Sequence, residues 1–337
     1  MMMRSNRRRT LRQLASATAA AAAILCGAAL LTPASAQELP ATIKLLVGFP
    51  AGAGTDLTAR AFAEGLAKEL KVTVIVDNRP GAGGMIAARA LKDAPADGST
   101  LMLAIDHQIV MVPHTVKTPG YDPLRDFQPI IQLATYDICT GVSGKSPAQT
   151  FAQWRTLART SAEHRTIGVP AAGSNAQFLA EAIARDFGVP MEVVPYKGGA
   201  PLITDISGGH VSAFVLPCGD PIVKAHEQGR ARILITSADK GHPRAPNATE
   251  FRKEGLKVPS SEGYFMAVYA NAKLAPRLVE ALKKASEAVA ARPEMPDKIA
   301  ATGMVPLTRN ADALKANVAR SSAAWGELVR QGGYKPE

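Results

Sequence analysis

Two segments of this chain combine glycine with small polar residues in a pattern that favours the binding of an anion. The first, at 48–56, follows an apolar run at 43–47, and the second, at 170–175, follows an apolar run at 166–169. Each precedes the pattern of an amphipathic helix. A helix N-terminus presents N–H groups without intrahelical acceptors and the positive end of the helix dipole. Two such turns in two parts of one chain predict a site that holds an anion from both sides.

Alternating apolar runs and helical patterns predict an α/β fold around these turns. In the first part of the chain, apolar runs at 43–47, 72–76 and 101–105 are each followed by a glycine-bearing or polar turn. The pattern restarts near residue 139, and further apolar runs lie at 166–169, 191–194, 211–216, 233–236 and 264–269. Strands that alternate with helices favour parallel, doubly wound sheets, in which ligands bind beyond the carboxyl ends of the strands.

The first 36 residues have the pattern of an export signal. Arginines open the chain, an alanine-rich apolar stretch follows at 14–31, and small residues at 34–36 predict cleavage after Ala36. We therefore predict export to the periplasm. The choice between the general and the twin-arginine route stays open, because Arg12 stands where the twin-arginine pattern favours an apolar residue. The alternative is an uncleaved membrane anchor, which the short apolar stretch disfavours.

The charge of the exported chain argues against a nucleic-acid partner. The signal holds five of the 39 basic residues and none of the 29 acidic ones, so 37–337 carries 34 against 29, a net charge of +5. This excess is spread along the chain without a long basic block. Because no other segment has a transmembrane length, we expect a soluble protein. We also expect a monomer.

The motifs of the common enzyme and cofactor classes are missing from the sequence. Counting from Gly52, the third glycine of the dinucleotide-binding pattern G-x-G-x-x-G falls at Leu57, and the glycines after residue 80 fail in the same way. No P-loop, G-x-S-x-G, H-E-x-x-H or C-x-x-C motif is present, so we predict neither a cofactor nor a metal. A hydrolase triad assembled from distant residues stays open, with His107 beside Asp106 as the histidine to test.

Two of the three cysteines, Cys139 and Cys218, remain after cleavage of the signal. An oxidising compartment would permit a disulfide between them. Their spacing alone cannot show that they meet. Our default expectation is therefore two buried apolar cysteines, with a disulfide as the alternative.

Several short motifs follow one another from residue 43 to the C-terminus. They are V-G-F-P-A-G-A-G-T-D at 47–56, N-R-P-G-A-G-G at 78–84, Y-D-P-L-R-D-F at 121–127, V-P-Y-K-G at 194–198 and G-R-A-R at 229–232. In this order and spacing, the chain resembles the Bug-type extracytoplasmic solute-binding proteins, the receptor family of tripartite tricarboxylate transporters. No single motif carries the resemblance.

This resemblance implies a periplasmic binding protein of type II, with two doubly wound α/β lobes, a cleft between them and a hinge that the chain crosses twice. Mapped on this sequence, 1–36 is the signal peptide, 37–138 plus 262–337 form lobe one, and 139–261 form lobe two. The family binds small carboxylates, among them dicarboxylates, acidic amino acids and aromatic acids. Its ligand carboxylate is held by backbone N–H groups of the two turns and by ordered water, in agreement with the anion site predicted above.

The turns and the resemblance together give one set of predicted ligand-binding residues. We expect the main contacts from the turn at Ala53, Gly54 and Thr55. Thr55 and Asp56 are also helix-capping residue types, and Asp56 is expected to orient the turn because its charge would repel a carboxylate. The full set is Phe49, Ala53, Gly54, Thr55, Asp56, Asp106, His107, Gly173, Ser174, Asn175, Tyr196, Cys218 and Asp220.

Residues of the second lobe carry most of the information on specificity. Ser174 and Asn175 either cap the second helix or donate to the anion. Leu216 stands where relatives that bind amino acids carry a carboxylate for the ligand ammonium, although Asp220 could replace it from another position. This departure favours a ligand without an amino group.

We therefore predict a non-enzymatic, exported receptor that closes two lobes on a small organic anion. Its partner would be a component of a membrane transporter. Two alternatives stay open: an enzyme of the same fold, such as a hydrolase that uses His107, and a ligand sensor that serves a signalling partner. The sequence identifies neither the carboxylate nor the partner.

Overall fold

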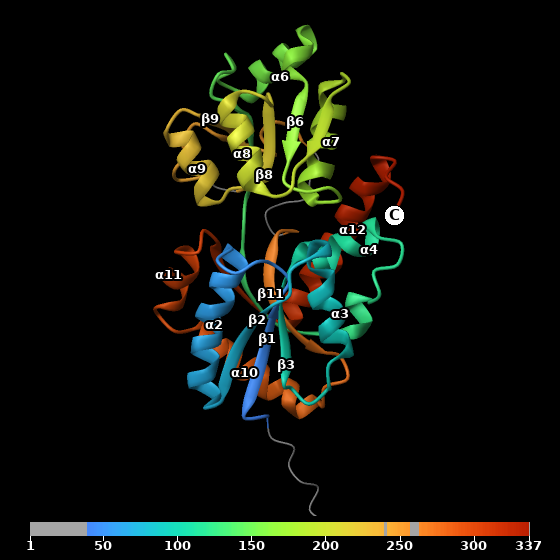
Figure 1. Ribbon diagram of the computed structural model, residues 1–337, viewed down its shortest axis with the longest axis vertical. Coiled ribbons are helices and arrows are strands. Elements are labelled where there is room, and N and C mark those ends of the chain that lie inside the picture. The colour runs from blue at the N-terminus through green and yellow to red at the C-terminus, as the bar shows by residue number, and fades with distance from the viewer. Residues whose placement is uncertain (1–38, 239–240, 257–262, 337) are drawn as a thin grey trace, which may run out of the picture. The chain divides into compact units, whose positions relative to one another are not determined.

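The computed structural model describes residues 39–238, 241–256 and 263–336, so the predicted signal peptide lies outside the described residues. Residues from Pro40 onward form one compact unit. Its strands form two six-stranded sheets, and helices pack against each of them (Figure 1). The expected architecture of two α/β lobes is thus confirmed.

The first sheet has the strand order β12-β4-β11-β3-β1-β2. Its strands are β1 (Thr42–Val47), β2 (Thr73–Asn78), β3 (Thr100–Ile105), β4 (Phe127–Thr135), β11 (Phe265–Asn271) and β12 (Val305–Asn310). The longer helices that accompany it are α2 (Gly54–Leu70), α3 (Met85–Asp93), α10 (Pro276–Ala290), α11 (Met295–Ala300) and α12 (Ala311–Gln331). Because β1 lies between β2 and β3 and is parallel to both, right-handed crossovers place α2 and α3 on opposite faces.

The second sheet repeats this arrangement, with the order β10-β9-β5-β8-β6-β7. Its strands are β5 (Ile138–Ser143), β6 (Thr166–Val169), β7 (Glu192–Pro195), β8 (Ala213–Pro217), β9 (Ala231–Thr236) and β10 (Thr249–Glu250). Its helices are α6 (Phe151–Thr160), α7 (Asn175–Phe187), α8 (Gly199–Gly208) and α9 (Asp220–Glu227). As in the first sheet, a central parallel strand, β6, is flanked by two parallel partners, β7 and β8.

The expectation of parallel sheets is wrong for part of each sheet. Strand β11 is antiparallel to both β3 and β4, and β5 is antiparallel to both β8 and β9. All residues of β11 and of β5 are buried. A strand that is buried on both faces gives a continuous apolar run in either direction, so the sequence pattern indicates its existence but not its direction.

The chain passes from the first sheet to the second between β4 and β5. The apolar pattern did not indicate β4, whereas β5 begins where the pattern restarts near residue 139. Only Tyr136 and Asp137 separate them. The chain returns to the first sheet at Tyr264, immediately before β11. The rings of Tyr136 and Tyr264 lie 5.5 Å apart between centroids, and the ring of Trp325 from α12 lies 5.7 Å from Tyr264. Aromatic contacts therefore bring the two crossings together in one buried cluster.

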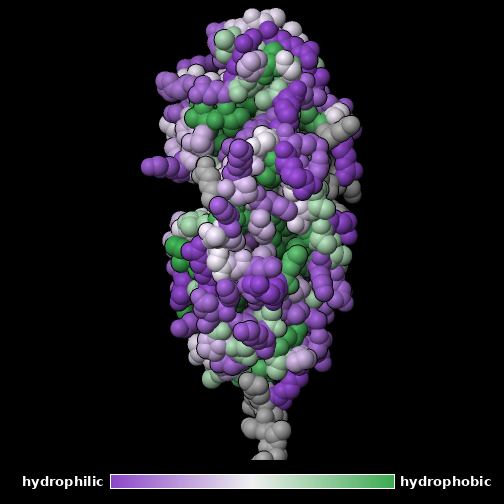
Figure 2. Space-filling view, turned by 90° about the vertical axis from the view of Figure 1, so that its right-hand side faces the viewer, coloured by the Kyte–Doolittle hydropathy of each residue, from purple (hydrophilic) through white to green (hydrophobic). Residues whose placement is uncertain are grey.

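The surface of the molecule is largely hydrophilic on the face shown in Figure 2, with hydrophobic residues in separate groups. Within residues 39–238, 241–256 and 263–336, no helix combines the length and the apolar character that crossing a membrane requires.

Cys139 and Cys218 form a disulfide, which corrects the default expectation of two unpaired cysteines. Cys139 lies in β5 opposite Leu216 of the antiparallel neighbour β8, and Cys218 follows β8 directly. Their Cα atoms are 5.0 Å apart, which is within the usual range for a disulfide. The sequence could not show this, because only the antiparallel pairing of β5 with β8 brings the two cysteines together.

We expect reduction of this disulfide to lower the free energy of unfolding. The linked residues are 79 positions apart, and the loop-closure entropy of the unfolded chain predicts a loss of about 4 kcal/mol. Urea unfolding of the chain 37–337, with and without dithiothreitol, would measure the difference. A double variant with Cys139→Ala and Cys218→Ala should show the lowered midpoint with or without the reductant. Equal midpoints for oxidised and reduced wild-type protein would contradict the crosslink.

Candidate functional site

The turn between β1 and α2 presents backbone N–H groups at the start of a long helix. The helix begins at Gly54, and Ala53 occupies the N-cap position with an extended backbone and no side-chain cap. The N–H group of Ala53 donates to the carbonyl of Pro50 at 3.3 Å. The N–H groups of Gly54 and Thr55 have no acceptor within the helix. Thr55 and Asp56 are not at the N-cap position that their residue types suggested, and their side chains are buried in the first turn.

Asp56 fixes the conformation of this turn. Its carboxylate accepts hydrogen bonds from the N–H of Gly52 at 2.8 Å, from Nε of Arg60 at 3.0 Å and from Nδ2 of Asn78 at 2.9 Å. Nδ2 of Asn78 also donates to the carbonyl of Phe49 at 3.1 Å. Burial raises the pKa of Asp56, but these hydrogen bonds outweigh burial and keep the pKa below its usual value. The contacts support a role in orienting the turn rather than in touching a ligand.

The glycines of the two predicted turns are required for different reasons. Gly52 and Gly173 have φ values of +82° and +67°, a region that favours glycine. Gly54 does not have a positive φ. A Cβ atom at Gly54 would, however, lie 2.5 Å from Cε of Met304 and 3.0 Å from the carbonyl oxygen of Thr302. Position 54 is therefore glycine because the segment 300–305 packs directly against the start of α2.

A buried carboxylate connects the ends of strands from both sheets. Asp106 follows β3 and is fully buried. It accepts hydrogen bonds from the hydroxyl of Tyr136, in the crossing between the sheets, and from Nδ2 of Asn175, the first residue of α7, at 2.9 Å. Burial raises the pKa of Asp106 to about 7, although these two donors and the backbone N–H of Phe265 act in the opposite direction. Asp106 and Asn175 of the predicted set are thus in direct contact.

His107 begins a π-helical turn (His107–Met111) immediately after this carboxylate. A Cβ atom at Gly83 would lie 2.6 Å from Nε2 of His107, so the ring packs against the backbone of the turn after β2. Burial lowers the pKa of His107 to about 4, which keeps the imidazole neutral at pH 7. A neutral ring packed in this way is poorly suited to a charge-assisted contact with an anion.

The turn before α7 uses its side-chain donors within the protein. Ser174 is the N-cap residue, and its Oγ accepts from the N–H of Gln177 at 3.3 Å and donates to the carbonyl of Ala171 at 2.7 Å. The amide of Asn175 donates to Asp106. Of the two alternatives for Ser174, capping is the one seen in the structure. Helix geometry gives the backbone N–H groups of Ser174 and Asn175 no acceptor within α7.

The remaining predicted residues of the second lobe have separate environments. Tyr196 donates its hydroxyl to Oδ2 of Asp205 at 2.8 Å. Cys218 is part of the disulfide, so it has no free thiol to offer a ligand. Asp220 begins α9, and its side chain lies outside what the structure describes.

A cavity of about 730 Å³ opens beside the start of α2, a size within the usual range for small-molecule sites. Of the predicted residues, Ala53 and Gly54 line it from the first lobe and Cys218 lines it from the second. Loop 300–305, which the sequence did not indicate, forms another side. Asp106 and Asn175 do not line this cavity and are buried instead.

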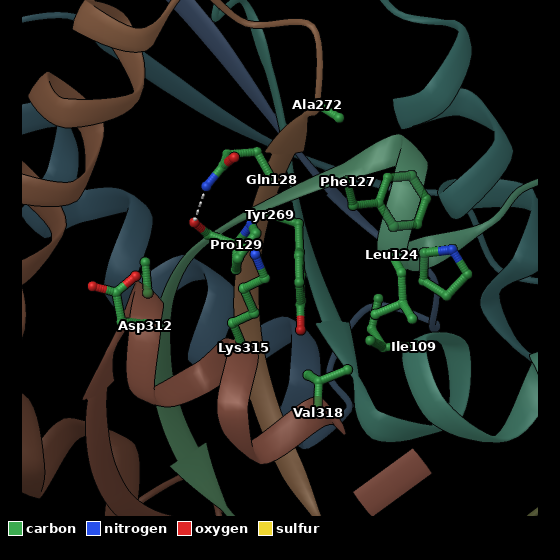
Figure 3. A pocket seen from close by; sticks show the side chains of 12 residues that line it. Ile109, Leu124, Phe127, Gln128, Pro129, Tyr269, Ala272, Asp312, Lys315 and Val318 are labelled. Atoms are coloured by element: carbon green, nitrogen blue, oxygen red, sulfur yellow. Dashed lines mark hydrogen bonds between the residues drawn. The ribbon is translucent and has the colours of Figure 1, made fainter. Parts of the chain in front are cut away.

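A smaller cavity of about 200 Å³ lies between the starts of β4 and α12 (Figure 3). Ile109, Leu124 and Phe127 lie on one side of it, and Asp312 and Lys315 from α12 lie on the other. None of the predicted site residues lines this cavity. We therefore do not assign it to the anion site.

The described ranges offer no arrangement for a metal ion: within them, no three His, Cys, Asp or Glu side chains group in a way that could hold one. Two of the histidines have partners within the protein. His114 shares a hydrogen bond with Ser322 at 2.9 Å, and His164 lies 3.2 Å from Glu163.

Several residues that build the site were not identified from the sequence. Tyr136 binds Asp106, and Gln108 connects two turns by donating to the carbonyl of Gly84 at 3.3 Å and accepting from the N–H of Ile105 at 3.0 Å. No local pattern marks either residue. The ion pair of Asp56 with Arg60 is different, because its i,i+4 spacing on α2 is visible in the sequence.

Comparison with known proteins shows which sequences resemble this one. The sequence model of the protein family described as tripartite tricarboxylate transporter family receptor matches residues 58–334. A UPF0065 protein in the gbd 5' region of Cupriavidus necator is 31% identical over 273 residues, covering 80% of this chain and 82% of that protein. Protein BugT of Bordetella pertussis is 28% identical over 314 residues, covering 91% and 94% of the two chains.

Solved structures with the same fold include a periplasmic binding protein and two ligand complexes. The R. palustris protein Rpa4515 with adipate matches with a TM-score of 0.76 at 26% identity, over 88% of this chain and 98% of that chain. The periplasmic binding protein BugD matches with a TM-score of 0.73 at 24% identity, over 88% and 99% of the two chains. MatC from Rhodopseudomonas palustris with bound malate gives a TM-score of 0.72 at 20% identity, over 86% and 98%. The last two likenesses show the fold alone.

We predict that Asn175→Ala destabilises the protein more at pH 8.5 than at pH 5. The folded-state pKa of Asp106, about 7, lies above the ordinary aspartate pKa of 3.8. Asp106 therefore adds stability that is complete below pH 3.8 and is lost as the pH rises through about 7. A hydrogen bond to the ionised carboxylate stabilises the fold more than a hydrogen bond to the neutral acid. Asn175→Ala should therefore lower the free energy of unfolding by about 1 kcal/mol more at pH 8.5 than at pH 5.

Urea unfolding at the two pH values would measure this difference, and comparison with wild type cancels the other titrating groups. The matched control is Asn310→Ala at the N-cap of α12, where the Asn side chain accepts from the N–H of Ala313. Its cost should be the same at both pH values. An equal cost of Asn175→Ala at pH 5 and pH 8.5 would show that Asp106 does not titrate as stated.

Proposed function

Because the chain belongs to the tripartite tricarboxylate transporter receptor family, we propose that it is an exported receptor that binds a small organic carboxylate between two lobes for such a transporter. One observation carries the proposal: the start of α2, with N–H groups that have no acceptor in the helix, lies beside a cavity that both lobes line. The family match supports a solute-binding receptor, and the turns supply the anion chemistry.

The ligands of similar proteins support a carboxylate. Rpa4515, at 26% identity, is a complex with adipate, and MatC, which shares the fold, is a complex with malate. Both acids are dianions at neutral pH. An anion of this kind is matched by backbone N–H donors and by the positive end of a helix dipole.

The proposed binding mode relies on backbone atoms. The N–H groups of Gly54 and Thr55 in the first lobe would bind the carboxylate. Those of Ser174 and Asn175, which do not line the cavity in this structure, would meet the carboxylate from the second lobe when the two lobes close on it. Ala53 is a weaker candidate, because its N–H already donates to Pro50. The lobe limits proposed from the sequence, 37–138 plus 262–337 and 139–261, are supported by the strands that make up each sheet.

Export to the periplasm is part of the proposal. The relative BugD is a periplasmic binding protein, and the basic, apolar and small-residue segments of 1–36 have the order of a cleavable signal. The disulfide between Cys139 and Cys218 gives independent support, because such bonds persist in oxidising compartments.

A receptor without enzymatic activity is the function we favour over the two alternatives. For a hydrolase, His107 would have to act as a base, and burial lowers its pKa to about 4, which makes it a weak one at neutral pH. A sensor would bind the same ligand in the same way. Only the effect of gene deletion on uptake or on signalling would separate the sensor from the transport receptor.

We expect at least one organic acid to raise the melting temperature of the chain 37–337. A ligand at one hundred times its dissociation constant adds about 2.7 kcal/mol to the free energy of unfolding. Thermal unfolding against mono-, di- and tricarboxylates, acidic amino acids and aromatic acids would identify it. If no acid changes the melting temperature of protein shown to be free of copurified ligand, the carboxylate assignment is wrong.

We predict that Thr55→Pro weakens binding of that acid about 10- to 100-fold. Proline removes the N–H at the second helical position without removing an intrahelical bond, and a hydrogen bond to a charged group is worth about 1.5 to 3 kcal/mol. Titration calorimetry would measure the change in affinity.

Two variants isolate the effect of this N–H group. Thr55→Ala removes the same side chain and keeps the N–H, and Asp312→Pro places proline at the equivalent position of α12, away from the cavity. Both should bind with nearly wild-type affinity. Equal affinities for Thr55→Pro and Thr55→Ala would exclude the N–H of Thr55 as a ligand contact.

A further inference from the structure

Two exposed hydrophobic side chains line the same cavity. Among the described residues, the large hydrophobic side chains with substantial exposure are Leu57, Ile75, Ile86, Leu124 and Val305. Of these, Leu57 (42% exposed) and Val305 (44% exposed) both line the cavity of about 730 Å³ beside α2. Exposed apolar surface gathered inside a concave site indicates an apolar binding partner.

The apolar side of this cavity is held firmly against the proposed carboxylate donors. Leu57 lies on α2, one turn after Gly54. The loop that carries Met304 and leads to Val305 at the start of β12 is tied to α2 by a hydrogen bond between the hydroxyls of Thr302 and Thr58 at 2.9 Å. The methyl group of Met304 fills the space where a Cβ of Gly54 would be. The apolar side chains of Leu57 and Met304 therefore lie next to the N–H groups at the start of α2.

The residues of the second lobe that line the cavity extend this apolar surface. They include the exposed Pro221 and Pro243. Arg244 also lines the cavity, but its guanidinium forms hydrogen bonds of 2.8 Å from Nε and Nη2 to the two carboxylate oxygens of Glu227. Its charge is thus matched by a protein group. Among the described residues that line the cavity, the other polar side chains are Asp137, His242 and Thr302, and the hydroxyl of Thr302 already donates to the carbonyl of Ile299. The described lining therefore offers few side-chain donors to a heavily hydroxylated ligand.

We propose that Leu57, Met304 and Val305 form an apolar subsite that determines specificity, and that it takes the hydrocarbon chain or ring of the bound acid. The inference rests on the proposed function, since the carboxylate at α2 places the chain in the subsite. The receptor then prefers acids with an extended apolar part over short or polyhydroxylated acids.

A series of acids of increasing length tests this preference. Titration calorimetry with the chain 37–337 would use straight-chain monocarboxylates and α,ω-dicarboxylates of four, six and eight carbons. In the series that binds, each added methylene should raise affinity about fourfold, the value for burial of one CH₂ group. Affinity that is flat or falls with length overturns the apolar subsite and leaves the carboxylate receptor intact. If no acid of either series binds, the proposed function fails as well.

Two variants assign the subsite to its residues. Leu57→Asn and Val305→Thr keep approximately the original side-chain volume at positions that are already partly exposed. Each should reduce the gain per methylene to less than twofold while the four-carbon acid binds as it does to wild type. Ile75→Thr, at an equally exposed hydrophobic residue of β2 outside the cavity, is the control and should leave the series unchanged. A full fourfold gain per methylene in both cavity variants would overturn the assignment.

Discussion

The buried carboxylate of Asp106 is the constraint on which the arrangement of the two lobes depends. A carboxylate removed from water is costly unless hydrogen-bond donors surround it. Its donors come from Tyr136 in the outgoing crossing, from Asn175 at the start of α7, and from the N–H of Phe265 after the returning crossing. All three must be in place at once. One side chain at the end of β3 thus forms hydrogen bonds with both crossings and with α7.

Around this carboxylate, backbones of neighbouring turns approach one another closely. A Cβ atom at Gly48 would lie 2.7 Å from the Cα of Gly84, and a Cβ at Gly84 would lie 2.5 Å from Nε2 of Gln108. Gln108 joins the turns after β2 and β3 through its amide. The carboxyl ends of the parallel strands are therefore packed without space for side chains at these positions. This close packing makes the turn before α2 a fixed platform rather than a free loop.

The polar side chains near the proposed site are mostly used to hold the protein together. Asp56 binds the N–H of Gly52 and Asn78, Ser174 caps α7, and Asn175 binds Asp106. In the proposed receptor, backbone N–H groups then recognise the carboxylate, which every organic acid shares. Discrimination between acids is left to the shape and the apolar character of the cavity.

Much of the local structure could be predicted from the sequence because its causes act over a few residues. Apolar runs and helical periodicity indicated β1, β3 and the helices that begin at Gly54 and Asn175. Glycine at positions 52 and 173 marked the two turns, and the order of the motifs indicated the family.

The tertiary structure alone decided the direction of β11, the disulfide and the partners of Asp106. Tyr136 and Asn175 are 30 and 69 residues away from Asp106, and the two cysteines are 79 apart. No pattern in the sequence records distances of this kind. They are set by the pairing of strands and by the requirement that a buried charge finds all of its donors, and both exist only once the chain has folded.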